Sequence, residues 1–252
     1  MTQPPIVLIT GGSRGIGAAT ARMAAAQGWA VAINYQHSHD AAQALVEEIQ
    51  AAGGLAQRVQ ADMGDAAQIE GMFEALDAHW GRPLQALVNN AGVVDRPCHV
   101  ADMTASRLER MFRINVLGSF LCASAAVRRM STARGGAGGC IVNVSSGAAL
   151  LGAPGQYVDY AASKGAVDTM TRGLAKEVAA EGIRVNAVRP GLIDTDIHAS
   201  GGLPTRVRDL SPTVPMQRGG TPEEVAAAIL WLMSPAASYT TGTFIDVTGG
   251  RH

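Results

Sequence analysis

Short apolar runs alternate with longer amphipathic stretches from one end of the chain to the other. The apolar runs have the length of strands and lie at 6–10, 30–34, 55–60, 86–89, 140–144, 183–188 and 243–247. The stretches between them have helical length and lie at 15–28, 39–52, 65–79, 104–132, 157–181 and 222–233. The strand-like runs are continuously apolar rather than alternating, which is typical of a parallel sheet covered on both faces.

The order of these elements predicts the fold class. Strands that alternate with helices are joined by right-handed crossovers in a doubly wound sheet. We therefore predict an α/β protein with a Rossmann-type, seven-stranded parallel sheet and helices on both faces. No linker interrupts the alternation, so residues 1–252 are predicted to form a single domain.

One long segment breaks the rhythm. Residues 192–221 contain several glycines and prolines and follow a predicted strand. They should therefore begin at the carboxyl edge of the sheet, where open α/β sheets bind ligands. Long excursions in compact domains are usually functional lids or disordered stretches. We favour a substrate-side lid over a plain surface insertion.

Composition and charge argue against several classes of function. The 252 residues carry 20 Lys and Arg against 21 Asp and Glu, a net charge of −1, and only 4% are aromatic. Such a chain lacks the basic field and the stacking platforms that nucleic-acid binding uses, and it has no charge to attract an anionic membrane. Its longest strongly apolar stretch, 225–233, is too short to cross a bilayer. We predict neither a nucleic-acid nor a membrane partner.

Cysteine and histidine usage indicates the compartment. Cys98, Cys122 and Cys140 are an odd number of cysteines without C-x-x-C spacing, which is typical of a reducing environment. The N-terminal residues lack a signal-peptide pattern, so we predict a cytoplasmic protein. The six histidines have no metal-ligand spacing, and no metal site is predicted.

A glycine-rich turn joins the first predicted strand to the first predicted helix. Residues 10–17 read Thr-Gly-Gly-Ser-Arg-Gly-Ile-Gly. Glycine allows a tight turn and close approach of a phosphate, and the start of the helix supplies unpaired N–H groups. The spacing of Gly11, Gly15 and Gly17 is neither G-x-G-x-x-G nor a Walker A loop. The strand–turn–helix context nevertheless favours a dinucleotide site over an ordinary turn.

The end of the second strand indicates which dinucleotide is bound. NAD-binding units usually place a carboxylate there, which bonds the ribose 2′-hydroxyl. Residues 34–38 here read Asn-Tyr-Gln-His-Ser, without a carboxylate. Arg14, Asn34, His37 and Ser38 are candidates to hold a 2′-phosphate instead. We therefore predict NADP(H) rather than NAD(H).

Tyr160 and Lys164 stand four residues apart in a predicted helix and therefore share one face of it. A tyrosine phenol has a pKa near ~10 and is a poor base at neutral pH. A fixed positive charge nearby lowers that pKa, which suits proton exchange with an alcohol or carbonyl oxygen. Tyr157 has no such partner, because Ala161 lies four residues after it.

Together these features resemble the short-chain dehydrogenase/reductase family over nearly the whole chain. The matching motifs are TGGSRGIG (10–17), Asp62 after the third strand, NNAG (89–92), Asn115, NVSS (143–146), YAASK (160–164) and PG (190–191). Their order and spacing are very specific. Within the family, the chain is similar to 3-oxoacyl-carrier-protein reductases and to glucose-dehydrogenase-like members.

The resemblance implies four catalytic roles. Tyr160 would exchange the proton with the substrate oxygen, and Ser146 would hydrogen-bond that oxygen. Ser145 is a second candidate, because the fourteen residues from Ser146 to Tyr160 are one more than is often seen. Lys164 would lower the tyrosine pKa and bond the nicotinamide ribose. Asn115 would kink its helix and hold a water in a proton relay to Lys164.

The resemblance also implies a set of cofactor contacts. Asp62 would bond the adenine amino group, with Met63 supplying a backbone contact. Asn89, Ala91 and Gly92 would line the adenosine side, with a purely structural role as the alternative for Asn89. The nicotinamide carboxamide would be contacted by Pro190, Gly191, Ile193 and Thr195. The full predicted cofactor-binding set is Gly11, Ser13, Arg14, Gly15, Ile16, Gly17, Asn34, Tyr35, His37, Ser38, Asp62, Met63, Asn89, Ala91, Gly92, Tyr160, Lys164, Pro190, Gly191, Ile193 and Thr195.

These roles imply an NADP(H)-dependent oxidoreductase that transfers hydride between nicotinamide and a carbonyl or secondary alcohol. The substrate stays open among 3-oxoacyl thioesters, sugars or polyols, and small ketones. The alternative is a catalytically silent NADP(H)-binding sensor or scaffold, which the intact Ser146, Tyr160 and Lys164 disfavour. The resemblance further implies a homotetramer or homodimer, with helices 104–132 and 157–181 and the strand near Phe244 at the contacts.

Overall fold

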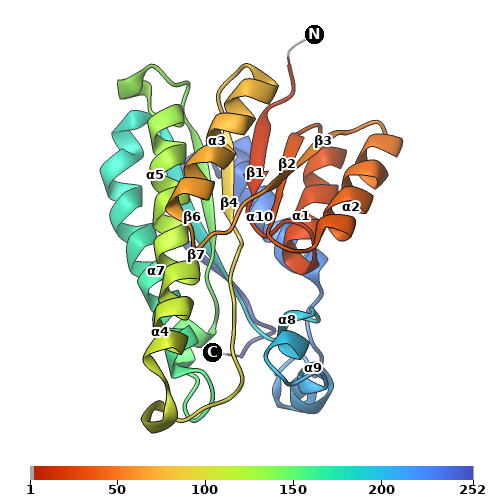
Figure 1. The fold of residues 1–252 in the computed structure, drawn as a ribbon, viewed down its shortest axis with the longest axis vertical. Helices are drawn as coiled ribbons and strands as arrows, with labels where there is room; N and C mark the ends of the chain where they lie inside the picture. The colour runs from red at the N-terminus through yellow and green to blue at the C-terminus, as the bar shows by residue number, and fades with distance from the viewer. Residues whose placement is uncertain (1–2, 252) are drawn as a thin grey trace.

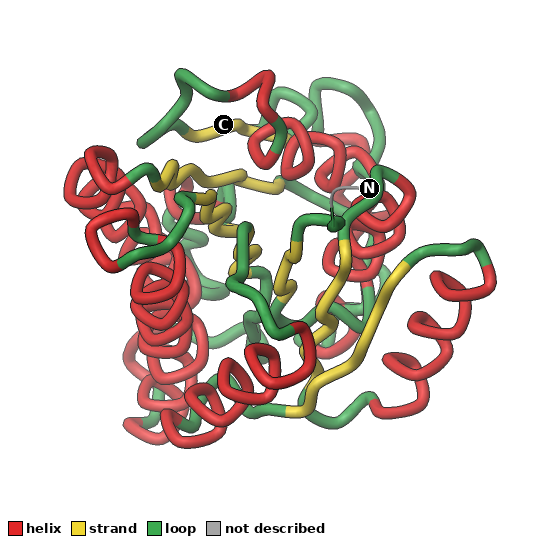
Figure 2. The backbone as a smooth tube through the Cα atoms, turned by 90° about the horizontal axis from the view of Figure 1, so that it is seen from above, coloured by secondary structure: helices red, strands yellow, loops and turns green. Residues whose placement is uncertain are grey.

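A wholly parallel, seven-stranded sheet runs through the computed structural model, which describes residues 3–251. Met1, Thr2 and His252 belong to the predicted domain but lie outside the described residues. The strand order is β3-β2-β1-β4-β5-β6-β7, and the strands lie between layers of helices (Figure 2). The strands are β1 (Ile6–Ile9), β2 (Ala30–Tyr35), β3 (Leu55–Gln60), β4 (Ala86–Asn89), β5 (Gly139–Val144), β6 (Ile183–Pro190) and β7 (Phe244–Val247). The predicted fold class is confirmed.

Small apolar side chains let the helices pack closely on both faces of the sheet. One face is covered by α1 (Gly15–Ala26), α2 (His39–Ala51) and α10 (Pro222–Met233). The other face is covered by α3 (Ala66–Trp80), α5 (Gly118–Met130) and α7 (Val158–Val178) (Figure 1). Every residue of β1, β2 and β4 is buried, which explains why these strands read as continuous apolar runs.

The predicted helix 104–132 is divided into two. Its first part, α4 (Ala105–Phe112), begins after Thr104, whose side chain accepts a hydrogen bond from the Arg107 amide. A π-helical turn, Arg113–Leu117, then leads into α5. π-turns inside helices insert one extra residue per turn and often mark functional positions. The expected kink at Asn115 is therefore present as this π-turn.

The segment 192–221 lies at the carboxyl end of the sheet and is tied together at its base. Ile193 pairs with Gly220 in an isolated parallel bridge, and the Asp194 amide donates to the Gly220 carbonyl. Between these ends lie α8 (Ile197–Ser200) and α9 (Arg206–Leu210) (Figure 1). A short helix, α6 (Ala148–Leu151), follows β5.

Among residues 3–251, no helix is long and apolar enough to span a bilayer.

Candidate active site

The turn between β1 and α1 is built from the backbone. Gly11 and Gly15 have φ values of +58° and +50°, in the left-handed region that glycine adopts without strain. A Cβ on Gly17 would lie 2.6 Å from the Gly11 carbonyl oxygen and 2.7 Å from the Asn90 side-chain nitrogen. Side chains at these positions would therefore force the turn apart. Ser13 is half-buried within the turn, and Ile16 packs against the core beneath it.

The start of α1 offers its amides to a ligand. Arg14 precedes the helix, and its side chain makes no capping hydrogen bond. The first amides of the helix thus have no side-chain partner, and the positive end of the helix dipole lies in the glycine turn. Backbone donors and partial positive charge in this arrangement suit a pyrophosphate. The chain's geometry at this turn fits a dinucleotide.

Two residues at the end of β2 are placed differently from the prediction. Asn34 is buried, and its Oδ1 accepts from the Gly11 amide at 3.0 Å while its Nδ2 donates to the Ala61 carbonyl at 3.1 Å. Tyr35 is also buried, with its hydroxyl 2.8 Å from Arg58 Nη1. Their side chains are consumed by internal bonds, so the prediction that they contact the cofactor directly is wrong for the side chains. Asn34 instead holds the glycine turn in place.

The other predicted phosphate-binding groups remain accessible. Arg14 is exposed, with its guanidinium 3.9 Å from the carboxylate of Asp196 in the 192–221 segment. His37 is exposed and Ser38 is half-buried, and both follow β2 at the same edge of the sheet. An exposed ion pair of this kind contributes little, so Arg14 is free to reorient toward another anion.

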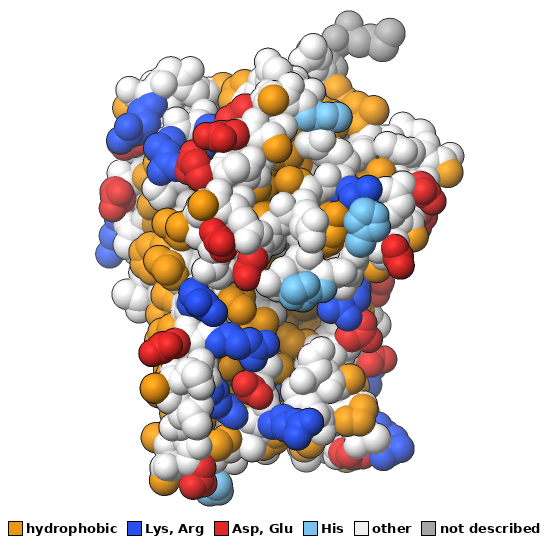
Figure 3. All heavy atoms as spheres, in the orientation of Figure 1, with side chains coloured by type: hydrophobic (Ala, Val, Ile, Leu, Met, Phe, Trp, Pro, Cys, Tyr) orange, Lys and Arg blue, Asp and Glu red, His pale blue; other side chains and the backbone are white. Residues whose placement is uncertain are grey.

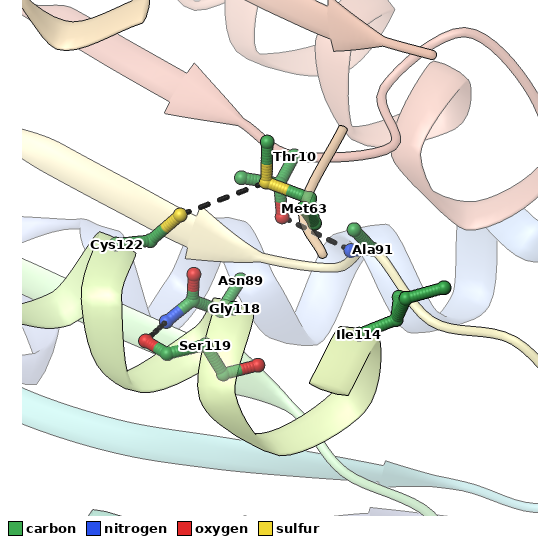
Figure 4. Close-up of a pocket in the computed structure, with 8 residues that line it drawn as sticks. All are labelled: Thr10, Met63, Asn89, Ala91, Ile114, Gly118, Ser119 and Cys122. Carbon is green, nitrogen blue, oxygen red and sulfur yellow. Dashed lines mark hydrogen bonds between the residues drawn. The ribbon is translucent and has the colours of Figure 1, made fainter. Parts of the chain in front are cut away.

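The third and fourth strands end beside the glycine turn. Asp62 is half-buried, and its Oδ1 accepts from the Gly64 amide at 2.7 Å. Thr10 Oγ1 accepts from the amides of both Asn90 and Ala91, at 3.0 Å each, which fixes the chain after β4 against β1. Met63 is buried, and Figure 4 shows it with Thr10 and Ala91 around a narrow space.

Asn89 lies on the inner side of that space. Its Nδ2 donates to Asn143 Oδ1 at 3.0 Å and to the Ser119 carbonyl at 3.2 Å (Figure 4). Its Oδ1 is buried and has no hydrogen-bond partner in the described part of the chain. These bonds join β4, β5 and α5, so the structure gives Asn89 a bracing position rather than an open cofactor contact.

Tyr160 and Lys164 lie together on α7 beside the end of β5. Lys164 Nζ is 5.8 Å from the centre of the Tyr160 ring and donates to the Val144 carbonyl at 2.8 Å. Ser146, two residues beyond β5, is half-buried and lies close enough to the Tyr160 phenol to act on its pKa. The three side chains form one polar cluster at the sheet edge that also carries the glycine turn. A phenol, a hydroxyl and an ammonium so arranged can bind a carbonyl oxygen and transfer a proton to it.

Ser145 is directed away from this cluster. It is buried, and its hydroxyl donates to Asp168 Oδ1 at 2.6 Å and to the Lys164 carbonyl at 3.3 Å. Of the two candidate serines, only Ser146 therefore reaches Tyr160.

Burial shifts the pKa values of Tyr160 and Lys164, and for Tyr160 the shift is opposite to the one predicted. Burial raises the pKa of the Tyr160 phenol above its usual value, and the hydrogen bond from Ser146 only partly opposes this. The same burial lowers the pKa of Lys164 to about 8, although the Asp168 carboxylate acts to raise it. A low-dielectric site disfavours both charged forms. The predicted lowering of the Tyr160 pKa is thus wrong for the chain described here, in which the phenol is neutral.

Asn115 is fully enclosed by its partners. Its Oδ1 accepts from the Val93 amide at 2.8 Å, and its Nδ2 lies 2.9 Å from the Val93 carbonyl and 3.1 Å from Ser163 Oγ. A Cβ on Gly92 would lie 3.4 Å from both Asn115 Oδ1 and Lys164 Nζ. Asn115 thus fixes the chain after β4, and Gly92 leaves room beside the lysine. Its role in a water relay stays a prediction.

The residues after β6 complete the edge. Pro190 ends β6, and Gly191 has no space for a side chain, because a Cβ would lie 2.7 Å from Thr248 Cα. Ile193 is buried at the base of the 192–221 segment. A Cβ on Gly15 would lie 3.2 Å from the Thr195 methyl group, so Thr195 covers the glycine turn. These predicted residues are therefore gathered around the turn and the Tyr160 cluster.

The sequence reading missed a buried ion pair behind the cluster. Asp168 Oδ2 accepts from Arg189 Nε at 2.9 Å and from Nη2 at 2.8 Å, while its other oxygen accepts from Ser145. Asp168 lies four residues after Lys164, and Arg189 immediately precedes the PG motif. Two features of the sequence could have indicated this pair: a carboxylate four residues after Lys164 in the predicted helix, and an arginine next to the PG motif.

Metal chemistry has no visible ligand set here. Among the described residues, no three His, Cys, Asp or Glu side chains come together to hold a metal ion. The thiols of Cys98, Cys122 and Cys140 are unpaired.

The glycine turn, the uncapped helix start and the Tyr160 cluster share one sheet edge, which defines a nucleotide-dependent oxidoreductase. A family model described as enoyl-(acyl carrier protein) reductase matches residues 11–252. The chain belongs to the short-chain dehydrogenase/reductase family.

Three curated relatives align with nearly the whole chain. YgfF, an uncharacterized oxidoreductase of Escherichia coli K12, is 57% identical over 98% of this chain and 99% of its own. A glucose and ribitol dehydrogenase homolog of rice is 38% identical over 97% of this chain and 85% of its own. A cis-4-hydroxycyclohexanecarboxylate dehydrogenase of Sinomonas cyclohexanicum is 42% identical over 97% and 95%. The predicted similarity to glucose-dehydrogenase-like members is confirmed.

Two solved structures agree with the fold along its length. A short-chain dehydrogenase of Burkholderia cenocepacia in complex with NADP is 35% identical, with a TM-score of 0.86 over 98% of each chain. A 3-ketoacyl-(acyl-carrier-protein) reductase of Brucella melitensis complexed with NADH is 31% identical, with a TM-score of 0.89 over 98% of each chain. The chain is thus also similar to the predicted carrier-protein reductases, and a nicotinamide cofactor is common to both structures.

Proposed function

We propose that the protein is an NADP(H)-dependent reductase that interconverts a carbonyl compound and its secondary alcohol. The observation that carries this proposal is the grouping of three polar side chains. Lys164 Nζ lies 5.8 Å from the centre of the Tyr160 ring, and Ser146 is close enough to the phenol to act on its pKa. This cluster lies at the same sheet edge as the glycine turn. A proton donor and a dinucleotide site are thereby next to each other.

Each side chain has a distinct task in this proposal. The bound nicotinamide supplies the hydride. Ser146 hydrogen-bonds the substrate oxygen and positions it, and Tyr160 gives its proton to that oxygen. Lys164 holds positive charge beside the developing oxyanion and bonds the nicotinamide ribose. Asn115 fixes the chain beside Lys164 and forms part of the route that returns a proton to the phenol.

Cofactor contacts follow the same edge of the sheet. The amides of the turn around Gly11, Gly15 and Gly17 would hold the pyrophosphate, and Asp62 would bond adenine. Residues 190–195 would contact the carboxamide. Arg14, His37 and Ser38 would bind a 2′-phosphate, since no carboxylate stands at the end of β2. The NADP complex of the Burkholderia relative supports this preference, while the NADH complex of the Brucella relative makes it a point to test.

The protonation state of Tyr160 suits the acid that carbonyl reduction needs. Because burial raises the pKa of Tyr160, the phenol carries its proton at neutral pH and acts as the acid. Oxidation would need the phenolate, which the same burial disfavours.

The substrate enters, in this proposal, beneath the 192–221 segment, which acts as a lid. The segment lies over the glycine turn through Thr195 and joins the sheet edge through Ile193. The names of the relatives include a polyol, a hydroxycyclohexanecarboxylate and a carrier-bound ketoacyl group. All share a secondary alcohol or ketone, which supports the reaction class.

Assembly and compartment belong to the same proposal. Leu117 and Phe120 near the start of α5 are each about half exposed, which supports a homotetramer or homodimer that buries this surface. Sedimentation that finds only monomer would contradict it. The three unpaired thiols support a cytoplasmic location.

The function is tested by oxidation of NADPH at 340 nm over ketones, ketoacyl thioesters and aldehydes, repeated with NADH. We expect turnover of at least one class, with lower KM for NADPH than for NADH. Tyr160→Phe should lower kcat by ~10²- to 10⁴-fold while NADPH still binds, because only the proton donor is lost. NADPH binding without turnover across the whole panel would favour the silent sensor.

A further inference from the structure

One arginine of the 192–221 segment has no counter-ion. Arg206 is half-buried at the start of α9, and its guanidinium carbon lies 5.2 Å above the ring of Tyr157. Within residues 3–251 the guanidinium forms neither an ion pair nor a side-chain hydrogen bond. Buried or half-buried charges in proteins are normally paired, because removing them from water is costly.

The other two arginines of the 192–221 segment do have a counter-ion. Arg208, on the same short helix, pairs with Asp209 at 3.1 Å. Arg218, at the end of the segment, pairs with Glu224 at 2.5 Å. Arg107, on α4, is paired with the buried Asp159 at 2.7 Å. The absence of a partner at Arg206 is therefore a local property and not a general feature of the segment.

The surroundings of Arg206 add positive rather than negative charge. Burial lowers the pKa of Arg206; the Tyr157 phenol acts to raise it, and repulsion from Arg251 acts to lower it. His198 is close enough for the charge of Arg206 to lower its pKa as well, although Asp194 acts in the opposite direction. Figure 3 shows Lys and Arg side chains along the lower half of the molecule, between α4 and the α8–α9 region. An anion would find unsatisfied donors here.

This position is directly connected to the reaction centre. Tyr157 is buried and caps the start of α7, three residues before Tyr160. Residues three apart lie on the same side of a helix, one turn or ~5 Å along its axis. Arg206 therefore contacts the residue that opens α7, the helix that carries Tyr160 in its first turn.

We propose that Arg206 binds an oxyanion, a carboxylate or a phosphate, that the carbonyl substrate carries on the part remote from the reacting group. The planar guanidinium matches the two oxygens of such a group, and Arg251 adds charge nearby. The inference rests on the proposed function, because it assigns the substrate class of the same site. It separates anionic ketones from the neutral sugars and ketones among the open substrates.

A latch is the competing explanation. The contact of Arg206 with the Tyr157 ring could serve only to hold the segment shut, since a cation–π contact is stabilising by itself. A latch would act equally on every substrate. An oxyanion site acts only on the charged member of a matched pair.

The test uses two matched pairs with the full-length protein and NADPH. The pairs are 4-oxopentanoate with its methyl ester, and dihydroxyacetone phosphate with dihydroxyacetone. The variants are Arg206→Gln, Arg206→Lys and, as the control on the same helix, Arg208→Gln. Steady-state kcat and KM are measured for each combination.

We expect the wild type to prefer the charged member of at least one pair. Arg206→Gln should lower kcat/KM for that member by ~10- to 150-fold, mainly through KM, and leave the neutral member within about twofold. Arg206→Lys should recover part of the loss, and Arg208→Gln should match the wild type. The pair that responds identifies the oxyanion as carboxylate or phosphate.

Other outcomes overturn the inference. An equal loss for charged and neutral members in Arg206→Gln would show a latch, and a wild type that prefers neutral members would exclude the oxyanion site. If the wild type reduces no ketone, calorimetric titration of the NADPH complex with pentanoate and pentanamide separates the two failures. Pentanoate binding that Arg206→Gln abolishes would then leave the anion site standing and remove the carbonyl reduction. Absence of pentanoate binding would remove both.

Discussion

The two halves of the active site are made of different parts of the polypeptide. The cofactor half, around residues 10–17, is formed by backbone amides, positive-φ glycines and one buried bracing amide, Asn34. The catalytic half is formed by side chains that are held from behind by a buried network of Ser145, Asp168 and Arg189. A phosphate is bound by several hydrogen-bond donors that it can approach closely, whereas a proton transfer needs one side chain held in a defined orientation.

This difference predicts which kind of substitution impairs each half of the site. Substitutions at the glycines of the turn act sterically, by adding atoms, because backbone amides rather than side chains would hold the pyrophosphate. Substitutions in the catalytic half act electrostatically. Removing one member of the buried ion pair leaves the charge of the other buried and unpaired. The predictions below address the two modes in turn.

The largest effect is expected from Arg189→Met. The Arg189 side chain is 7% exposed, and that of its partner Asp168 is 6% exposed. The substitution leaves a buried carboxylate without its cation, which should lower the free energy of unfolding by ~3–5 kcal/mol. Guanidinium unfolding followed by circular dichroism, at one protein concentration, measures it.

Arg22→Met is the matched control for that experiment. Arg22 pairs with Glu48 at 2.8 Å, but the two side chains are 48% and 53% exposed. Water screens this pair, so its removal should cost at most ~1 kcal/mol. Equal losses in the two variants would show that the network behind Tyr160 does not carry the stability assigned to it.

A smaller effect is expected from Gly17→Ala in the cofactor half. The added methyl would lie 2.6 Å from the Gly11 carbonyl oxygen, and relief requires movement of the turn. Overpacking of this kind costs ~1–3 kcal/mol, and the displaced amides should bind NADPH more weakly. Unfolding and the fluorescence of bound NADPH report the two consequences.

Gly71→Ala is the matched control in this case. Gly71 lies within α3, and a Cβ there would meet nothing within 4 Å. Alanine is the better helix former, so this variant should gain up to ~1 kcal/mol and keep its NADPH affinity. Weaker NADPH binding in Gly71→Ala, or none of the loss in Gly17→Ala, would contradict the steric account.

The same division explains what could be predicted from the sequence. The turn at 10–17 and the pair Tyr160–Lys164 are local patterns, whose spacing along the chain fixes their geometry. The fold followed from periodicity for a similar reason, since buried strands and helices repeat with different periods. Only the π-turn at Asn115 divided an element that periodicity had joined.

What could not be predicted depends on contacts between distant parts of the chain. Asn34 is polar and ends a strand, as a ligand would, yet its amide turns inward to Gly11 and Ala61. The pKa of Tyr160 was expected to fall because Lys164 is four residues away. The structure adds burial, which a local pattern does not contain and which outweighs the lowering effect of Ser146.

The smallest expected effect is a shift in the pH dependence of carbonyl reduction. Carbonyl reduction should decrease above about pH 8, where Lys164 loses its proton, because burial lowers its pKa to about 8. Tyr160 contributes no decrease in this range, since its raised pKa keeps the phenol protonated. The decrease of kcat/KM at alkaline pH, its alkaline limb, therefore reports the loss of the Lys164 proton.

Asp168→Asn should move that limb to lower pH. The Asp168 carboxylate acts to raise the pKa of Lys164, and its loss leaves the lowering effect of burial unopposed. A displacement of up to ~1 pH unit, equal to ~1.4 kcal/mol, is expected. Ser145→Ala serves as the control, because it removes the 2.6 Å hydrogen bond to Asp168 but keeps the carboxylate charge, so its limb should stay near pH 8. A limb in Asp168→Asn that stays in place or moves to higher pH would show that charge from the buried network does not reach Lys164, and that the network acts on stability alone.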